Sequence, residues 1–201
     1  MGLRELKKER TRRLISETAQ RLFAERGFDA VRVAEVARAA EVSEASVFNF
    51  FPAKEDLFFA GLDDFGDRLV AAVRDREPGT PVLAACKREM LGGNAWLEAI
   101  DAGDATARER AQMVVRVLDG SPALQARERR ALDRIGAALA RELGGSLNDQ
   151  VVAGAIIGLH AALIRLTRSL AADGTPGGLT AAAHDQATEA FRLLEKGFGA
   201  Y

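Results

Sequence analysis

The sequence is poor in the residues that support cross-links, metal sites and redox chemistry. Cys86 is the single cysteine among 201 residues, so an intrachain disulfide is impossible. The whole chain contains only two histidines in addition, which are too few ligands for a zinc site. We therefore predict no metal centre and no cofactor. It also lacks a glycine-rich phosphate loop and a G-x-S-x-G nucleophile elbow, so we predict that it is not an enzyme.

Strand-forming residues are scarce as well, and aromatic residues make up 6% of the chain. Ala, Leu, Arg and Glu dominate instead, which favours helix nearly everywhere, so the predicted fold class is all-α. No apolar segment follows the charged N-terminus as it would in a signal peptide. The most apolar stretch, Val151–Ile164, is shorter than the roughly 20 residues that span a membrane. We therefore expect a cytoplasmic protein without a membrane partner.

Charge is unevenly distributed along the chain. Residues 1–13 contain six basic and two acidic side chains, a net charge of +4, whereas the remainder contains 22 basic and 27 acidic side chains, a net charge of −5. A basic end on an acidic body is typical of a protein that meets a polyanion at that end. A solvated, frayed N-terminus is the alternative interpretation.

Hydrophobic periodicity, glycines and prolines divide the chain into about nine predicted helices. The first covers residues 4–26, and two short ones cover residues 33–40 and 45–51. A single uninterrupted helix is predicted from Lys54 to about Glu77. The remaining helices are separated by Pro and Gly pairs, and the last begins near Thr180.

The segment from Val33 to Phe51, VAEVARAAEVSEASVFNFF, has the pattern of two short helices that cross at a fixed angle. Its apolar positions suit packing across a turn, and Ser43 is placed to cap the second helix. This arrangement would present Asn49 outward, and Asn can form paired hydrogen bonds with adenine in the major groove. A plain helical hairpin buried in a core is the alternative.

The run from Gly27 to Leu57, GFDAVRVAEVARAAEVSEASVFNFFPAKEDL, resembles the tetracycline-repressor (TetR) family of bacterial regulators. The resemblance covers residues 10–58 and implies a transcriptional repressor that binds a palindromic double-stranded DNA operator as a homodimer. It implies release by an unknown small-molecule effector. The expected domains are a three-helix helix-turn-helix domain at 1–56, with its motif at about 33–52, and an effector-binding and dimerisation domain at 57–201. The alternative is a helical-bundle interaction module of the same fold that has lost specific DNA binding.

The resemblance also assigns DNA-binding roles to particular residues. The groove-facing set is Ser43, Glu44, Ala45, Ser46 and Asn49. The residues expected near phosphates, or at the start of the preceding helix, are Phe48, Phe50, Lys54, Arg32 and Val33.

The chain departs from the usual family pattern at several of these positions. Glu41 stands where family members have glycine, and a left-handed backbone there costs a non-glycine residue about 1–2 kcal/mol. Arg32 and Ala53 stand where capping residues are common, and each lost cap costs about 1 kcal/mol. Phe48 and Phe50 replace residues that could hydrogen-bond phosphate. These differences affect the expected DNA contacts more than the expected fold.

The segment Val151–Ile164 is apolar nearly all round, which predicts a helix covered on both sides. Small residues at four-residue spacing would let a second helix approach closely. We therefore predict a dimer interface built from this helix and the last one, with a core helix inside one chain as the alternative. The predicted interface residues are Gly154, Gly158, Ala162, Phe191 and Leu194.

Bulky or polar side chains in the C-terminal part are candidates for the lining of an effector pocket. They are Phe65, Met90, Trp96, Met113, Arg116 and His160. Ordinary core packing, or solvation in the case of the arginine, is the alternative for each. The expected helix from Lys54 to Glu77 would transmit effector binding to the DNA-binding helices as a rigid lever.

Overall fold

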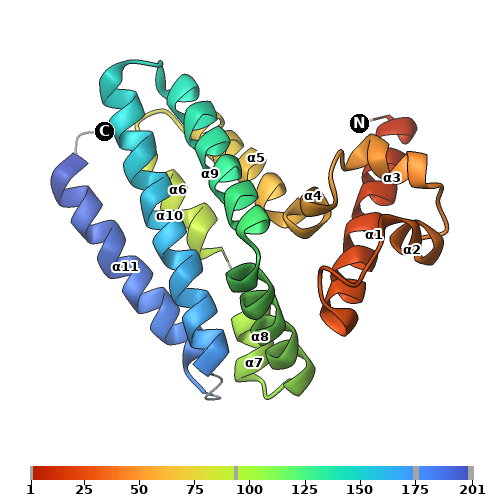
Figure 1. Ribbon diagram of the computed structural model, residues 1–201. Helices are drawn as coiled ribbons and strands as arrows, with labels where there is room; N and C mark the ends of the chain where they lie inside the picture. The colour runs from red at the N-terminus through yellow and green to blue at the C-terminus, as the bar shows by residue number, and fades with distance from the viewer. Residues whose placement is uncertain (1, 93–94, 174–176, 199–201) are drawn as a thin grey trace. The chain divides into compact units, whose positions relative to one another are not determined.

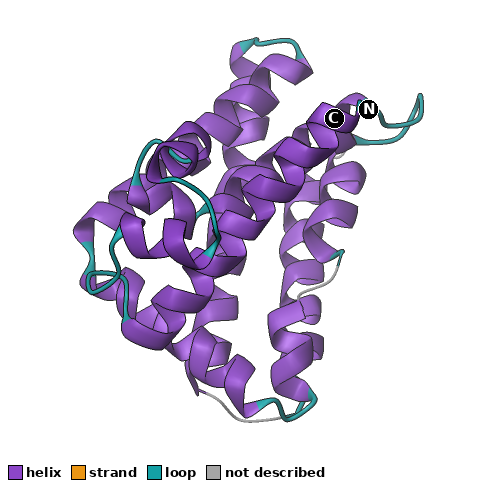
Figure 2. Ribbon diagram, turned by 90° about the vertical axis from the view of Figure 1, so that its right-hand side faces the viewer, coloured by secondary structure: helices purple, strands orange, loops and turns teal. Residues whose placement is uncertain are grey.

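The helices of this protein are joined by short turns, and the computed structural model describes them over residues 2–92, 95–173 and 177–198 (Figure 1). Across these ranges the regular structure is helical and no strand is present (Figure 2), which confirms the all-α prediction. The helices are α1 (Leu3–Arg26), α2 (Val33–Ala39), α3 (Glu44–Phe50), α4 (Lys54–Phe58), α5 (Ala60–Arg74), α6 (Val82–Leu91), α7 (Ala95–Asp101), α8 (Ala105–Gly120), α9 (Pro122–Leu143), α10 (Leu147–Asp173) and α11 (Leu179–Phe198).

The described ranges thus contain eleven helices rather than about nine, because two predicted helices are interrupted. The helix expected from Lys54 to Glu77 is divided at Phe59, whose backbone (φ −101°, ψ 16°) leaves helical geometry, and α5 ends at Arg74. The prediction of one uninterrupted lever helix is therefore wrong. The physical reason is tertiary, since this departure accompanies the burial of the Phe59 ring, which is 5% exposed.

The second interruption separates α7 from α8 and has a local cause. Gly103 adopts a left-handed backbone (φ 85°), which glycine tolerates without strain. The next residue, Asp104, then caps α8, because its Oδ1 accepts hydrogen bonds from the backbone N–H groups of Thr106 (2.9 Å) and Ala107 (3.1 Å). The Gly-Asp pair was a readable signal that the sequence analysis missed.

The chain divides into two compact units. Unit 1 contains residues 1–62 and 116–128, so the end of α8 and the start of α9 belong to it. Its core is formed by side chains of α1, α2, α3 and α4, of the turns between them and of the start of α9. The largest fully buried members are Phe23, Ile15, Leu57, Val31, Val36 and Leu124.

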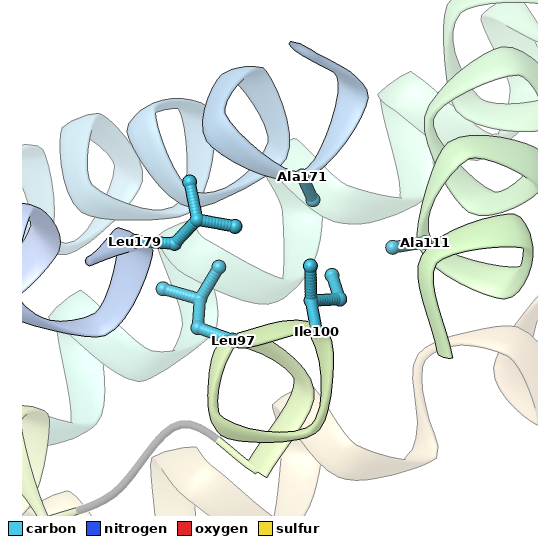
Figure 3. Packing of buried hydrophobic residues seen from close by; sticks show 5 residues of the cluster. All are labelled: Leu97, Ile100, Ala111, Ala171 and Leu179. Atoms are coloured by element: carbon cyan, nitrogen blue, oxygen red, sulfur yellow. The ribbon is translucent and has the colours of Figure 1, made fainter. Parts of the chain in front are cut away.

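Unit 2 contains residues 63–115 and 129–201, and within it α10 and α11 lie side by side (Figure 1). Figure 3 shows one of its apolar clusters, in which Leu97 and Ile100 of α7 meet Ala111, Ala171 and Leu179 from α8, α10 and α11. Asp101, at the end of α7, accepts hydrogen bonds from the backbone N–H groups of Leu179 (3.0 Å) and Thr180 (2.9 Å). This carboxylate therefore caps α11 from a distant part of the chain.

The apolar helix α10 is longer than the sequence suggested. Its segment Leu147–Ala172 is 26 residues long with a mean hydropathy of 1.5, so by length and composition it could cross a membrane. The prediction that this helix is too short is thus wrong. Core helices of soluble proteins share these properties, and Val152, Ala153, Ile156 and Ile157 of α10 are buried inside unit 2.

Candidate nucleic-acid interface

The turn between α2 and α3 fixes how these two short helices cross. Val36 and Val47 are fully buried, one from each helix. Glu41 has φ 55°, so a non-glycine residue holds a left-handed backbone at the position where family members have glycine. The backbone N–H of Val42 donates to Ala37 O (2.9 Å), which closes the turn.

Ser43 caps α3 as predicted. The backbone N–H of Ser46 donates to Ser43 Oγ (3.1 Å), and the two hydroxyl oxygens lie 2.8 Å apart. A side-chain cap of this kind satisfies one of the N–H groups that a helix start leaves without a partner. The start of α3 is therefore held by a residue in its own sequence neighbourhood.

The expected loss of caps at Arg32 and Ala53 is offset by carboxylates in the first turn of each helix. The backbone N–H of Arg32 donates to Glu35 Oε2 (2.8 Å), and that of Ala53 donates to Asp56 Oδ2 (3.0 Å). These bonds are one half of a capping box, since the other half requires a side-chain acceptor at the cap position. Glu35 also pairs with Arg26 Nη1 at 2.7 Å, and these bonds hold the pKa of Glu35 below its ordinary value.

The predicted groove-facing residues lie mostly at the surface of α3. Glu44, Ala45 and Asn49 are exposed, and Ser43 beside them is exposed as well. Ser46 is half-buried because it takes part in the cap. The side of α3 opposite Val47 is therefore open to a ligand along most of its length.

The predicted phosphate-facing residues differ more in their surroundings. Arg32 and Phe48 are exposed, whereas Val33 and Phe50 are half-buried. Lys54 is half-buried, with Nζ 4.2 Å from the ring centroid of Phe28 and 5.9 Å from that of Phe23. Burial lowers the pKa of Lys54, while nearby carboxylates, Asp29 first among them, oppose this shift. The Lys54 ammonium thus packs on an aromatic surface of unit 1.

One buried interaction in unit 1 was missed by the sequence analysis. Arg127 Nε donates to Asp56 Oδ1 at 2.6 Å, and the guanidinium carbon lies 5.8 Å from the Phe59 ring centroid. Asp56 therefore binds the start of α4 through one oxygen and the start of α9 through the other. No local pattern announces a pair separated by 71 residues.

Two members of the predicted effector set, Phe65 and His160, are in contact. The rings of Phe65 and His160 stack with centroids 4.0 Å apart and planes 11° apart. Met90 and Met113 are half-buried residues of unit 2, and Arg116 is an exposed residue of unit 1. The side chain of Trp96 lies outside the described residues.

The predicted interface residues also fall into two groups. Gly154, Gly158 and Ala162 are exposed, on the same side of α10 as the exposed side chains of Leu147 and Val151. Phe191 is fully buried in unit 2, where it fills the core, and Leu194 is half-buried. The α10 residues thus form a surface, whereas Phe191 does not.

Comparison with known proteins shows which regulators the chain resembles. Residues 15–60 match the family described as "Bacterial regulatory proteins, tetR family". The HTH-type transcriptional regulator TcmR of Streptomyces glaucescens is 30% identical over 145 residues, which cover 70% of this chain and 62% of that protein. The HTH-type transcriptional regulator YuxN of Bacillus subtilis (strain 168) is 36% identical over 56 residues, which cover 28% of this chain and 19% of that protein. The chain therefore spans less than two thirds of the length of either curated relative.

A solved structure extends the similarity in fold to nearly the whole chain. The TetR-family transcriptional regulator from Mesorhizobium loti MAFF303099 is 16% identical, with 94% of this chain and 96% of that chain covered at a TM-score of 0.54. The relatives are transcriptional regulators, which agrees with the prediction that the chain is not an enzyme. The tetR-family match at residues 15–60, the similarity to curated transcriptional regulators and the shared fold together support a TetR-family regulator.

Proposed function

We propose that the chain is a cytoplasmic, homodimeric repressor that binds a palindromic DNA operator through α2 and α3 and leaves it when a small-molecule effector binds. The observation that carries this proposal is the exposed polar side of α3, supported from behind by the buried Val47 and at its start by the Ser43 cap. A rigid helix with an exposed Asn is what major-groove reading requires. The division into a DNA-binding domain at 1–56 and an effector and dimerisation domain at 57–201 is part of the proposal.

The test of DNA reading starts from DNA duplexes that the wild-type protein selects from a random library. Asn49→Ala is expected to weaken binding to a selected duplex by about 1–3 kcal/mol and to relax the preference at one base pair. Asn148→Ala is the matched control, because it removes another exposed Asn, at the start of α10. An unchanged sequence preference in Asn49→Ala would show that the assigned reading face is wrong.

The alternative is an interaction module of the same fold that has lost specific DNA binding. Phe48, 46% exposed, and the half-buried Phe50 favour it, since neither can hydrogen-bond a phosphate. Salt titration separates the two functions, because DNA affinity falls steeply with salt for a protein that neutralises several phosphates. A wild-type protein that selects no sequence and shows no salt-dependent DNA binding would favour the interaction module.

Dimerisation is supported by the exposed side of α10. Leu147 is 74% exposed and Val151 is 52% exposed, and both continue the line of Gly154, Gly158 and Ala162 at helical spacing. A methyl group added at Gly154 or Gly158 would meet no atom of this chain within 4 Å. Close packing inside one chain therefore does not explain these glycines, whereas close approach of a second copy does.

Substitution of Gly158 tests this interface. Gly158→Leu is expected to leave the chain folded and to shift light scattering at micromolar concentration from dimer to monomer. Gly61→Leu is the matched control, because Gly61 is also an exposed helical glycine with open space around it. A wild-type protein that scatters as a monomer would contradict the proposed assembly.

Effector release requires a link between the effector region and the DNA-binding helices. The interrupted helix at Phe59 removes the rigid lever, and the pair between Arg127 and Asp56 offers a different link, from the first turns of α9 to the residue that caps α4. Coupling of this kind is typically about 1–3 kcal/mol and is reciprocal. Once an effector is found by screening, its affinity should therefore fall when operator DNA is present. Equal effector affinities with and without DNA would contradict release.

A further inference from the structure

We infer that Arg4 and Lys8 form a second DNA contact, to phosphates beside the segment that α3 reads. This inference rests on the proposed DNA-binding function and adds a face of α1 to it. The family match begins only at residue 15, so the segment involved lies outside the matched region.

Helix α1 continues beyond the part that packs in unit 1. Its buried residues begin at Ile15, whereas residues 4–10 are all exposed. At about 1.5 Å per residue, this exposed part adds roughly 10 Å of helix. Apolar packing does not account for it, so its side chains are available to an external ligand.

One side of this exposed helix has a defined position relative to α3. Arg4, Lys8 and Arg12 follow one another at four-residue spacing and continue the line of the buried residues Ile15, Ala19 and Leu22. Arg12 lies next to the end of α3, because its guanidinium carbon is 5.2 Å from the ring centroid of Phe51. Phe51 directly follows the last residue of α3. Lys8 and Arg4 therefore lie on the same side of α1 as Arg12, one and two turns beyond the contact with the end of α3.

The charge of this side matches a nucleic-acid backbone. Arg4 and Lys8 are both exposed, and neither has an ion-pair partner among the described residues. Glu5 and Glu9 follow each of them by one residue and so project about 100° away around the helix. Basic groups in the first turns of a helix are also disfavoured by its dipole, and a bound phosphate would offset that cost. DNA is the favoured ligand of this side of α1 because the side lies next to the end of α3, the proposed reading helix.

Two double variants with the same loss of charge test whether the side of α1 that loses the charge matters. Arg4→Gln with Lys8→Gln removes two charges from the proposed side, and Arg10→Gln with Arg13→Gln removes two from roughly the opposite side of the same helix. The probes are a mixed-sequence duplex and a duplex that the wild-type protein selects from a random library. Affinity for each is measured over a series of salt concentrations.

The first double variant should reduce the slope of log affinity against log salt by about 1.8, since each phosphate contact contributes about 0.9. Its affinity for the selected duplex should fall roughly tenfold near 0.1 M salt. The second double variant should change the slope by less than half as much. Circular dichroism and thermal unfolding should match the wild type for both, because all four side chains are exposed.

Three results would overturn the inference. Equal slope changes in the two double variants would show that only the overall charge matters, and the proposed function would stand. Altered binding to phosphatidylserine vesicles with unchanged DNA binding would assign the basic side to a membrane surface. Absence of salt-dependent DNA binding by the wild-type protein would overturn the inference and the proposed function together.

Discussion

Unit 1 and unit 2 keep their helices in place by different means. In unit 1, α2, α3 and α4 contain 7, 7 and 5 residues, below the roughly 12–15 residues at which an isolated helix becomes even marginally stable. Each begins with a hydrogen bond between residues three positions apart: Arg32 with Glu35, Ser43 with Ser46, and Ala53 with Asp56. Local bonds of this kind set where the short helices begin, while burial of Val36, Val47 and Leu57 holds the helices in the unit.

In unit 2, α9, α10 and α11 contain 22, 27 and 20 residues. Here too a local bond begins a helix, since the Ser146 N–H donates to Asp149 Oδ2 (2.8 Å) at the start of α10, but bonds between distant residues are added. The start of α11 is capped by Asp101, 78 residues before Leu179. Arg74 Nε donates to Glu142 Oε2 (3.2 Å) across 68 residues of sequence. The starts of α2 and α3 are therefore set by residues three positions apart, whereas unit 2 also depends on bonds between residues far apart in the sequence.

The exception to this comparison, the buried pair of Arg127 and Asp56 in unit 1, gives the largest expected effect. Their side chains are 8% and 19% exposed, so Arg127→Ala would leave the Asp56 carboxylate with little solvent and no cation. We expect the free energy of unfolding to fall by about 3 kcal/mol, measured by urea denaturation.

Arg134→Ala is the matched control on the same helix. Its pair with Asp63 also spans 71 residues, at 3.2 Å, but the side chains are 64% and 32% exposed. Exposed pairs contribute about 0–1 kcal/mol, so this variant should remain close to the wild type. Equal losses in the two variants would show that burial does not distinguish the pairs.

Close packing in unit 2 predicts the next largest effect. A Cβ at Gly66 would lie 2.6 Å from Ile135 Cγ1 and 2.8 Å from Ile135 Cδ1, so α5 and α9 can meet there only at glycine. Gly66→Ala should therefore lower the free energy of unfolding by about 1–2 kcal/mol, despite the better helix propensity of Ala. Gly61→Ala, in the same helix but with open space, should be neutral or slightly stabilising. Stabilisation by both substitutions would disprove the close approach.

In the turn before α3, a substitution is expected to stabilise the protein rather than destabilise it. Because Glu41 holds a left-handed backbone at φ 55°, Glu41→Gly should raise the free energy of unfolding by about 1 kcal/mol. Arg38→Gly, at an exposed position inside α2, should instead lower it by about 1 kcal/mol. Thermal unfolding of the two variants checks the signs, and a destabilised Glu41→Gly would show that the carboxylate has a role in the turn.

The smallest effect concerns pH and the local bonds of α2. The pKa of Glu35 is lowered first by the hydrogen bond from the Arg32 N–H and then by Arg26, so the folded state binds fewer protons than the unfolded state. The stabilisation is complete above the ordinary pKa of 4.5 and is lost as pH falls through the lower folded value. Urea denaturation from about pH 7 to pH 3 should therefore show a weaker pH dependence in Glu35→Gln than in the wild type. Glu17→Gln is the control and should keep the pH dependence of the wild type. If Glu35→Gln keeps it as well, the Glu35 carboxylate does not contribute the predicted stabilisation.

Features that depend on residues a few positions apart could be predicted from the amino-acid sequence. The end of α1 before Gly27, the two short helices α2 and α3 and the Ser43 cap were all predictable. Each is decided within one or two helical turns, where propensity, side-chain caps and steric limits on the backbone act directly.

Features that join distant residues depend on how the whole chain packs and could not be predicted. The tertiary structure interrupted the helix at Phe59, placed Phe191 in the core rather than on a surface, and brought Arg127 to Asp56. It also divided α10, apolar nearly all round in sequence, into a buried side and the exposed side that contains Gly154 and Gly158. An apolar pattern predicts that a helix is buried. The shapes of the neighbouring helices determine which side they bury and which side stays exposed to a partner.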